Sequence, residues 1–253
     1  MNAEKSFTFP FEDQEWISKL GLGAIISLVP ILNFAWSGYL VGIIRNVMSN
    51  DAEPLPTWDN LEKKFSEGLI LFGAGLVYAF PILVALCLPL GVTASSSLFS
   101  GNRDMEDIAR TLTGAGGVLF FCFLGILLLY GLLLSILYPA ILVMFSREGT
   151  FASCFKLREA FALISKNAGP FFTAWILSVA ASLGAGLLVG FVNMVVGFVP
   201  CVGWIVGLAL SMISGVYATA VYAHLFGQFG RAAFAGERVR TVMPAGDGGV
   251  SMS

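Results

Sequence analysis

The chain has 253 residues and a formal net charge of −2, with 57% hydrophobic and only 12% charged residues. Soluble globular domains carry about 25% charged residues, so this composition excludes an ordinary soluble domain and indicates membrane helices. The balanced charge gives no reason to expect a nucleic-acid partner. The first fifteen residues are acidic and lack the basic, then apolar pattern of a secretory signal peptide. We therefore expect membrane insertion to depend on internal helices.

The first hydrophobic region, residues 20–48, is interrupted by Pro30 and Asn33. One interpretation is a single membrane span with a proline kink. The other is a hairpin of two short helices that turns at residues 30–33, because proline stops a helix and asparagine tolerates a turn. Each arm would be short for a full span of about 20 residues, a shortfall that tilt, local thinning or a re-entrant hairpin could absorb.

A polar loop with Pro54, Pro56 and Trp58 follows, and the spacing of Leu61, Phe65 and Leu69 predicts a short interfacial helix capped by Asp59 or Asn60. Farther along, a second interfacial helix is predicted over residues 151–165, capped by Thr150. Four long apolar stretches predict full membrane spans: residues 69–92, 117–145, 171–199 and 202–229. Residues 95–113 read as one long outer loop.

The distribution of basic residues favours the hairpin, because cytoplasmic loops collect Lys and Arg. With a hairpin, all 14 Lys and Arg residues except Arg103 and Arg110 fall on one side of the membrane. With a single span, Lys5 and Lys19 move to the other side. We therefore predict an all-α, polytopic transmembrane bundle of about six segments plus two interfacial amphipathic helices. It divides into a cytoplasmic N-terminal segment (1–15), a membrane domain (16–230) and a flexible cytoplasmic tail (231–253), and both termini face the cytoplasm at the cell membrane.

Paired glycines four residues apart mark three candidate helix-packing faces, because small residues let membrane helices approach closely. These residues are Gly38, Gly42, Gly186, Gly190, Gly203 and Gly207. Residues 29–34 also resemble residues 199–204, and Pro30, Asn33 and Pro200 are candidate hairpin-turn residues. An internal duplication and two unrelated tight turns both explain this likeness. Five basic residues are candidates for binding lipid headgroups: Lys63, Lys64, Lys156, Arg158 and Lys166.

His224, the single histidine, is a candidate for a proton-relay or ligand role, although its place near a helix end also fits an ordinary interfacial histidine that reaches water. No charged residue lies deep in an apolar stretch, which argues against an ion-coupled pump. The motifs of metalloproteases, serine hydrolases and nucleotide-binding proteins are absent from the sequence. We therefore predict no enzyme activity, no cofactor and no metal.

Several short motifs share an order with a known family. They are Gly38-Tyr39, Arg45, Leu55-Pro56-Thr57-Trp58, Glu67-Gly68-Leu69 and Tyr138-Pro139-Ala140. This order resembles the domain-of-unknown-function family 4013 of bacterial and archaeal membrane proteins, over roughly residues 10–230. The resemblance implies a multi-helix membrane protein without an established activity, so it supplies no catalytic residues.

Three hypotheses about function follow. The first is a structural or accessory membrane protein that packs with further copies of itself or with other membrane subunits, in contact with membrane lipids. The second is a transporter or lipid-handling protein, suggested by the repeat and the broken first region. The third is an intramembrane enzyme that uses His224. We favour the first.

Overall fold

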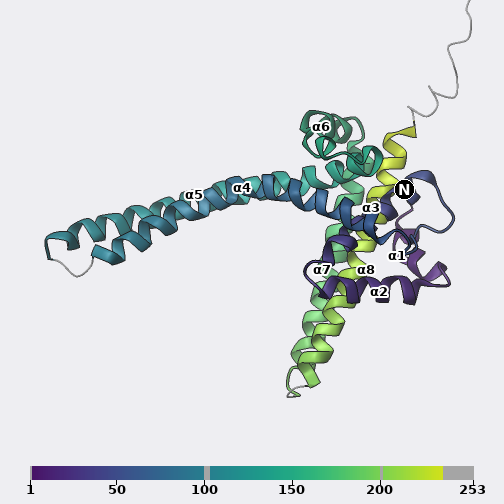
Figure 1. The fold of residues 1–253 in the computed structure, drawn as a ribbon, viewed down its shortest axis with the longest axis horizontal. Helices are drawn as coiled ribbons and strands as arrows, with labels where there is room; N and C mark the ends of the chain where they lie inside the picture. The colour runs from purple at the N-terminus through teal and green to yellow at the C-terminus, as the bar shows by residue number, and fades with distance from the viewer. Residues whose placement is uncertain (1, 100–102, 200–201, 236–253) are drawn as a thin grey trace, which may run out of the picture. The chain divides into compact units, whose positions relative to one another are not determined.

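The computed structural model describes residues 2–99, 103–199 and 202–235, which form eight α-helices and one 3₁₀ helix with no strand (Figure 1). The predicted all-α class is confirmed. In chain order the elements are α1 (Ala3–Glu12), α2 (Trp16–Leu28), α3 (Asn33–Ser49), α4 (Leu61–Phe99), α5 (Arg103–Glu148), η1 (Phe151–Phe155), α6 (Leu157–Lys166), α7 (Ala168–Val196) and α8 (Val202–Ala233).

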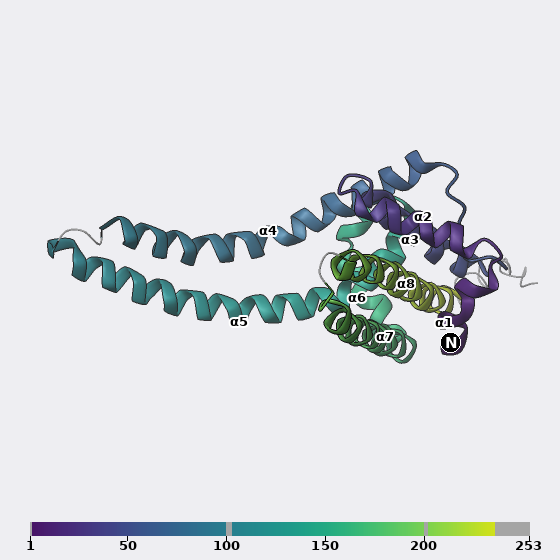
Figure 2. The same ribbon diagram turned by 90° about the horizontal axis from the view of Figure 1, so that it is seen from below.

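The described residues fall into two compact units. The first unit combines the residues up to Ile70 with those from Pro139 onward, and the second unit is Leu71–Tyr138. In the second unit α4 and α5 lie side by side (Figure 2), and the Tyr130 hydroxyl donates to the Tyr78 carbonyl at 2.9 Å.

Four helices within the described residues are long and apolar enough to cross a membrane: Leu61–Val84, Leu124–Glu148, Ala168–Val196 and Gly203–Ala233. They correspond to the four predicted long spans, so the chain is a helical membrane protein. The predicted interfacial helix after Asn60 is wrong as a separate element, because these residues form the first turns of α4. The predicted outer loop is also wrong, because residues 95–99 and 103–113 are helical.

The first hydrophobic region consists of two helices rather than one kinked helix, as the hairpin interpretation predicted. α2 ends at Leu28 and α3 begins at Asn33. Pro30 lies in the turn between them, and the Asn33 amide donates to the Val29 carbonyl at 2.9 Å. Pro30 and Asn33 are both exposed. α2 has 13 residues and α3 has 17, so both are shorter than a full span.

The core of the first unit is built around α8 and α3. α8 packs against α7, α3, α2 and α1, and Figure 2 shows α7 on one side of α8 and α2 with α3 on the other. Residues 220–230 of α8 are buried apart from the partly exposed Tyr222. On α3, Ala35, Tyr39, Ile43 and Ile44 are fully buried. Both helices are covered on several faces, which is typical of central helices in a bundle.

The crossing of α3 and the start of α4 depends on two glycines. A Cβ atom at Gly38 would overlap the carbonyl of Lys64, and one at Gly68 would overlap the carbonyl of Phe34. Only residues without a side chain let the two backbones come this close. Beside the crossing, Arg45 of α3 forms an ion pair with Glu67 of α4 at 3.0 Å. Arg45 therefore joins α3 to α4.

The loop before α4 packs back on α3 through its proline and tryptophan. The Trp58 ring stacks on the Tyr39 ring with a centroid distance of 4.5 Å. The Trp36 ring also stacks on Tyr39, with a centroid distance of 5.1 Å. The Trp58 indole donates to the Lys19 carbonyl of α2 at 2.8 Å. Pro56 lies against Gly42, where a Cβ atom would be 2.8 Å from the proline ring. The Gly-Tyr and Leu-Pro-x-Trp motifs therefore form one structural contact.

The predicted amphipathic helix over residues 151–165 consists of two pieces, η1 and α6. Thr150 makes no side-chain cap, so that part of the prediction is wrong, although its carbonyl accepts from the Ser153 amide at 3.0 Å. Phe161 is 65% exposed on α6, while Ile164 is buried. An exposed phenylalanine on a short amphipathic helix is typical of a helix that lies at a membrane surface.

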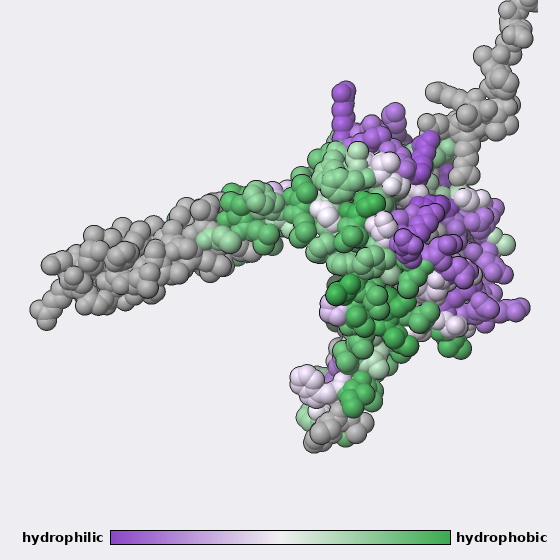
Figure 3. All heavy atoms as spheres, viewed as in Figure 1, coloured by the Kyte–Doolittle hydropathy of each residue, from purple (hydrophilic) through white to green (hydrophobic). Residues whose placement is uncertain are grey.

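Apolar side chains cover the outer part of the α7–α8 hairpin, and hydrophilic residues gather around α1 (Figure 3). Leu187, Phe191, Phe198 and Trp204 are all strongly exposed there. In water such a surface would aggregate, but in a bilayer it contacts lipid chains.

Candidate functional site

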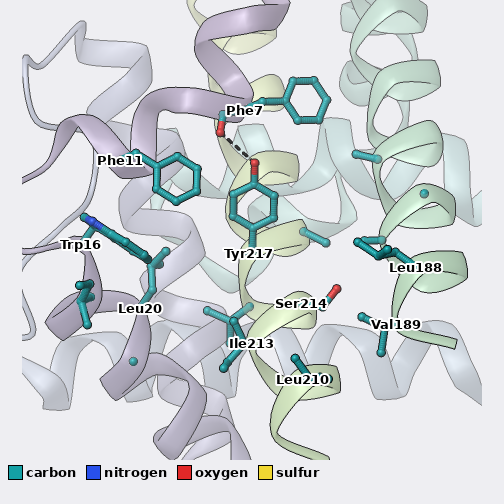
Figure 4. A pocket seen from close by; sticks show the side chains of 17 residues that line it. Phe7, Phe11, Trp16, Leu20, Leu188, Val189, Leu210, Ile213, Ser214 and Tyr217 are labelled. Atoms are coloured by element: carbon teal, nitrogen blue, oxygen red, sulfur yellow. Dashed lines mark hydrogen bonds between the residues drawn. The ribbon is translucent and has the colours of Figure 1, made fainter. Parts of the chain in front are cut away.

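An apolar groove lies between α1 and α2 on one side and α7 and α8 on the other (Figure 4). Its volume is about 740 Å³. The lining combines large aromatic and aliphatic residues with small ones, and Ser214 and Tyr217 are the residues with a side-chain hydroxyl. The lining residues are Phe7, Phe11, Trp16, Ile17, Leu20, Gly21, Ala181, Gly184, Ala185, Leu188, Val189, Leu210, Ile213, Ser214, Val216, Tyr217 and Ala218.

The lining residues of α7 and of α8 each share one face of their helix. On α7, Ala181, Gly184, Ala185 and Leu188 recur every three or four residues and so share one face. The same spacing on α8 relates Leu210, Ile213, Ser214 and Tyr217.

Two glycines leave open space at the groove wall. A Cβ atom built at Gly21 or at Gly184 would meet no other atom within 4 Å. The backbone of α2 and α7 is therefore accessible from inside the groove, and a larger side chain at either position would enter the groove without displacing its neighbours.

The short helix α1 forms the fourth wall with Phe7 and Phe11. The Tyr217 hydroxyl of α8 donates to the Phe7 carbonyl at 2.8 Å, so this hydroxyl is used in holding α1 in place (Figure 4). Phe11 makes an edge contact with Trp16, with ring centroids 5.0 Å apart. The interior of the groove is therefore almost entirely apolar.

A buried polar cluster holds the other end of α1 against α8. The Gln228 amide nitrogen donates to the Asn2 carbonyl and to the Ser6 hydroxyl, both at 3.0 Å, and its oxygen accepts from the Asn2 amide at 2.8 Å. Nδ1 of His224 lies 3.0 Å from the Ser6 hydroxyl. The His224 ring also stacks on Phe9 with a centroid distance of 4.2 Å. Charge-free hydrogen bonds of this kind are each worth about 1 kcal/mol.

His224 is therefore not the water-accessible histidine that the sequence suggested, since it is only 3% exposed. The reason is α1, which covers this face of α8 and had been predicted only as part of an N-terminal segment. Within the part of the chain that the structure describes, no carboxylate is hydrogen-bonded to His224. Its neighbours are a hydroxyl, an amide and an aromatic ring.

The predicted glycine faces lie in different surroundings. Gly38 and Gly42 meet α4 and Pro56, as described above. A Cβ at Gly203 would overlap the Val196 carbonyl, and one at Gly207 would be 2.8 Å from Oδ1 of Asn193, so both glycines face α7. Gly186 and Gly190 have no atom within 4 Å of such a Cβ. A packing role for these two glycines stays a prediction, in which the packing partner is another protein chain or a lipid.

Two of the five candidate headgroup residues are held by the protein itself. Lys64 donates to the Asp59 carbonyl at 2.6 Å. Lys156 forms an ion pair with Glu148 at 3.0 Å, and this hydrogen bond raises the pKa of Lys156 above its usual value. Lys63, Arg158 and Lys166 are exposed. Lipid-headgroup binding by these residues stays a prediction, and Pro200 lies outside the described residues.

Sequence reasoning missed the contribution of α1 to the groove. A signal existed, because Phe7 and Phe11 are four residues apart and Asn2 is a good helix N-cap, whose side chain accepts from the Lys5 amide. The groove itself has no sequence signature, since its walls come from four helices far apart in the chain.

The comparison with protein families identifies the chain's family. A family model described as "Protein of unknown function (DUF4013)" matches residues 22–194. This range includes all the short motifs that suggested the family and most of α7. The resemblance predicted from those motifs is confirmed. No curated protein and no solved structure matches the chain. Because α1 and α8 lie outside the matched range, two walls of the groove have to be interpreted from this chain alone.

Proposed function

The chain belongs to the DUF4013 family of proteins of unknown function, and from that premise we propose that it is a non-enzymatic membrane protein that binds a lipid hydrocarbon chain in the groove. The observation that carries the proposal is the apolar groove of about 740 Å³. Small-molecule sites usually enclose about 300–1,000 Å³ and have mostly apolar walls.

The depth of the groove along α7 and α8 supports this ligand. Its α7 residues fall between positions 181 and 189, near the middle of the apolar helix Ala168–Val196. Its α8 residues fall between positions 210 and 218, near the middle of Gly203–Ala233. When both helices cross a bilayer, this level lies in the hydrocarbon core, where lipid chains are the available ligand.

The chemistry of the lining supports a binding role rather than catalysis. A nucleophile needs a base within hydrogen-bond reach. Among the described residues, Ser214 is not hydrogen-bonded to a histidine or a carboxylate. The Tyr217 hydroxyl is bonded to the Phe7 carbonyl, and His224 does not line the groove. An apolar ligand needs none of these groups, because at this depth a lipid chain is held by van der Waals packing against the groove walls.

Filling the groove tests the proposal. In nanodiscs, a photoactivatable phospholipid with its reactive group on the acyl chain should label α7 and α8 of the wild type. Gly184→Leu should reduce this labelling several-fold, because the leucine side chain would occupy space that the acyl chain fills in the wild type. Gly21→Leu should act in the same way from the opposite wall.

Gly186→Leu is the matched control, since it lies on the same helix, is equally open and does not line the groove. Its labelling should equal that of the wild type. Equal labelling of wild type, Gly184→Leu and Gly21→Leu would show that the chain does not enter the groove.

A second function, an accessory subunit that receives a helix of another membrane protein, is favoured by one feature of the same groove. Ala181, Gly184 and Ala185 expose a strip of α7 backbone, and such strips allow close helix approach. A single cysteine at Ala181 would then form cross-links to a protein in native membranes, and Gly184→Leu would abolish them. Cross-links to lipid alone would support the first function.

The orientation also belongs to the proposal. The basic residues support a cell-membrane protein with both termini in the cytoplasm, because only Arg103 and Arg110 fall on the other side of the six-segment arrangement.

A further inference from the structure

A second, polar cavity of about 230 Å³ lies at the end of α8, on the other side of the polar cluster from the groove. It is bordered by the N-terminus of α1, the C-terminal end of α3 and the following loop, and the last turns of α8. Unlike the groove, its lining includes two cations, Lys5 and Arg231.

Neither cation forms an ion pair with a residue that the structure describes. Arg231 donates to the Asn50 side-chain oxygen. Asp51 is the acid on the cavity lining, and it too is without an ion pair there. With His224 neutral, the cavity therefore carries a net charge of +1, from two cations and one carboxylate.

Two buried polar side chains complete the lining. His224 and Gln228 are 3% and 4% exposed, and both line the cavity. The Ser6 hydroxyl donates to the Asn2 carbonyl at 3.2 Å and accepts from the Gln228 amide at 3.0 Å, and Nδ1 of His224 lies 3.0 Å from the same hydroxyl. Asn2, which caps α1, also lines the cavity, and a helix N-terminus carries partial positive charge.

We propose that this cavity is a binding site for a phosphate group, held by Lys5 and Arg231 beside the N-terminus of α1. Two cations on different helices and a helix N-terminus match the several oxygens of a phosphate better than they match a single carboxylate. The phosphate can belong to an anionic phospholipid or to a soluble phosphate compound. The site is independent of the hydrocarbon chain proposed for the groove.

The experiment measures two probes on the full-length protein. Inorganic phosphate is titrated by calorimetry into protein in phosphatidylcholine nanodiscs, and native mass spectrometry counts phosphatidylglycerol retained from mixed phosphatidylcholine–phosphatidylglycerol membranes. Lys5→Gln and Arg231→Gln should each weaken binding of the occupying probe about tenfold, because each removes one charge-assisted contact. Asp51→Asn should strengthen binding, because it removes the repelling carboxylate.

Arg158→Gln is the control, since it removes an exposed cation from α6, outside the cavity. Thermal unfolding of every variant shows whether the fold is kept, and Asp51→Asn provides a gain in binding that misfolding cannot mimic.

The outcomes identify the ligand. If the Lys5 and Arg231 variants lose binding of inorganic phosphate, the site holds a soluble phosphate. If they lose phosphatidylglycerol alone, the site holds a lipid headgroup. Retention of both probes by the two variants, or failure of the wild type to bind either probe, would overturn the proposal. Acyl-chain labelling of the groove should be unchanged in the same variants. The labelling therefore tests the proposed function of the groove separately from the phosphate site.

Discussion

Tyr39 makes contacts of two opposite kinds. Its ring is fully buried between Trp36 and Trp58, which joins α3 to the loop before α4. Its hydroxyl is buried too, but it has no hydrogen-bond partner among the described residues. A buried polar group without a partner costs about 1–3 kcal/mol relative to its state in water. The aromatic ring therefore stabilises the fold while the hydroxyl weakens it.

This division leads to a prediction about two substitutions. Tyr39→Phe should leave the melting temperature in detergent unchanged or raise it, because it removes the unpaired hydroxyl and keeps the stacked ring. Tyr39→Ala should destabilise the protein by about 3–5 kcal/mol, the usual cost of deleting a buried aromatic ring. A clear fall in the melting temperature of Tyr39→Phe would mean that the hydroxyl has a partner that contributes to stability, such as a buried water.

At the scale of elements, the α3–α4 crossing shows how one face is chosen from several candidates. The sequence marked Gly38 through its spacing from Gly42, yet the residue opposite Gly38 is Lys64, and the second glycine of the crossing is Gly68. Spacing along one helix shows where a backbone is exposed. It does not show which helix will lie against it, because that depends on the direction of the loop in between.

Alanine substitutions on α4 test the crossing. Gly68→Ala should lower stability by about 1–3 kcal/mol, since the new Cβ overlaps the Phe34 carbonyl and forces the helices apart. Gly75→Ala, on the same helix, meets no atom within 4 Å and should be neutral or raise stability by up to about 1 kcal/mol through helix propensity. Both values come from thermal unfolding in one detergent. Equal effects of the two substitutions would show that the α3 and α4 backbones are not in close contact at Gly68.

At the scale of the molecule, the topology depends on how the α2–α3 pair meets the bilayer. α7 and α8 are long enough to span it, whereas α2 is shorter and runs across α8 in Figure 1. Two arrangements agree with short helices joined by an exposed turn. In one, both helices cross the membrane and the turn reaches the outer surface. In the other, the pair is re-entrant and the turn stays on the protected side.

A single cysteine at Leu32, in a variant whose native cysteines are replaced by serine, decides between them. Leu32 lies in the turn and is 39% exposed, so a reagent that reaches it can react. We expect labelling of intact cells by a membrane-impermeant maleimide, because the distribution of basic residues favours an arrangement with this turn outside. A cysteine at Lys63 should react only after the cells are opened. Protection of Leu32 from both sides would favour a re-entrant pair and would reduce the number of full spans.

Much of the helical architecture was accessible from the sequence because it depends on local composition. A run of about 20 apolar residues has to satisfy its own backbone in a bilayer, and a helix does so without any partner. Pro30 ends a helix through its own ring, so the α2–α3 break was also visible. The motifs Gly38-Tyr39 and Leu55-Pro56-Thr57-Trp58 led to the family because each is a short, contiguous pattern.

The groove and the polar cavity at the end of α8 were decided only by tertiary structure. Tyr217 and Phe7 are 210 residues apart in the chain. The hydrogen bond between His224 and Ser6 joins residues 218 apart. A composition-based prediction treated α1 as a polar N-terminal segment, because Glu4, Lys5 and Glu12 dominate its local character. Its position on α8 depends instead on Ser6, Phe9 and the hydrogen bonds to Gln228. The sequence by itself determined that the chain is a membrane helical protein, since each long helix carries that information locally. Which faces meet, and what space they enclose, depended on contacts between distant helices, which no local pattern encodes.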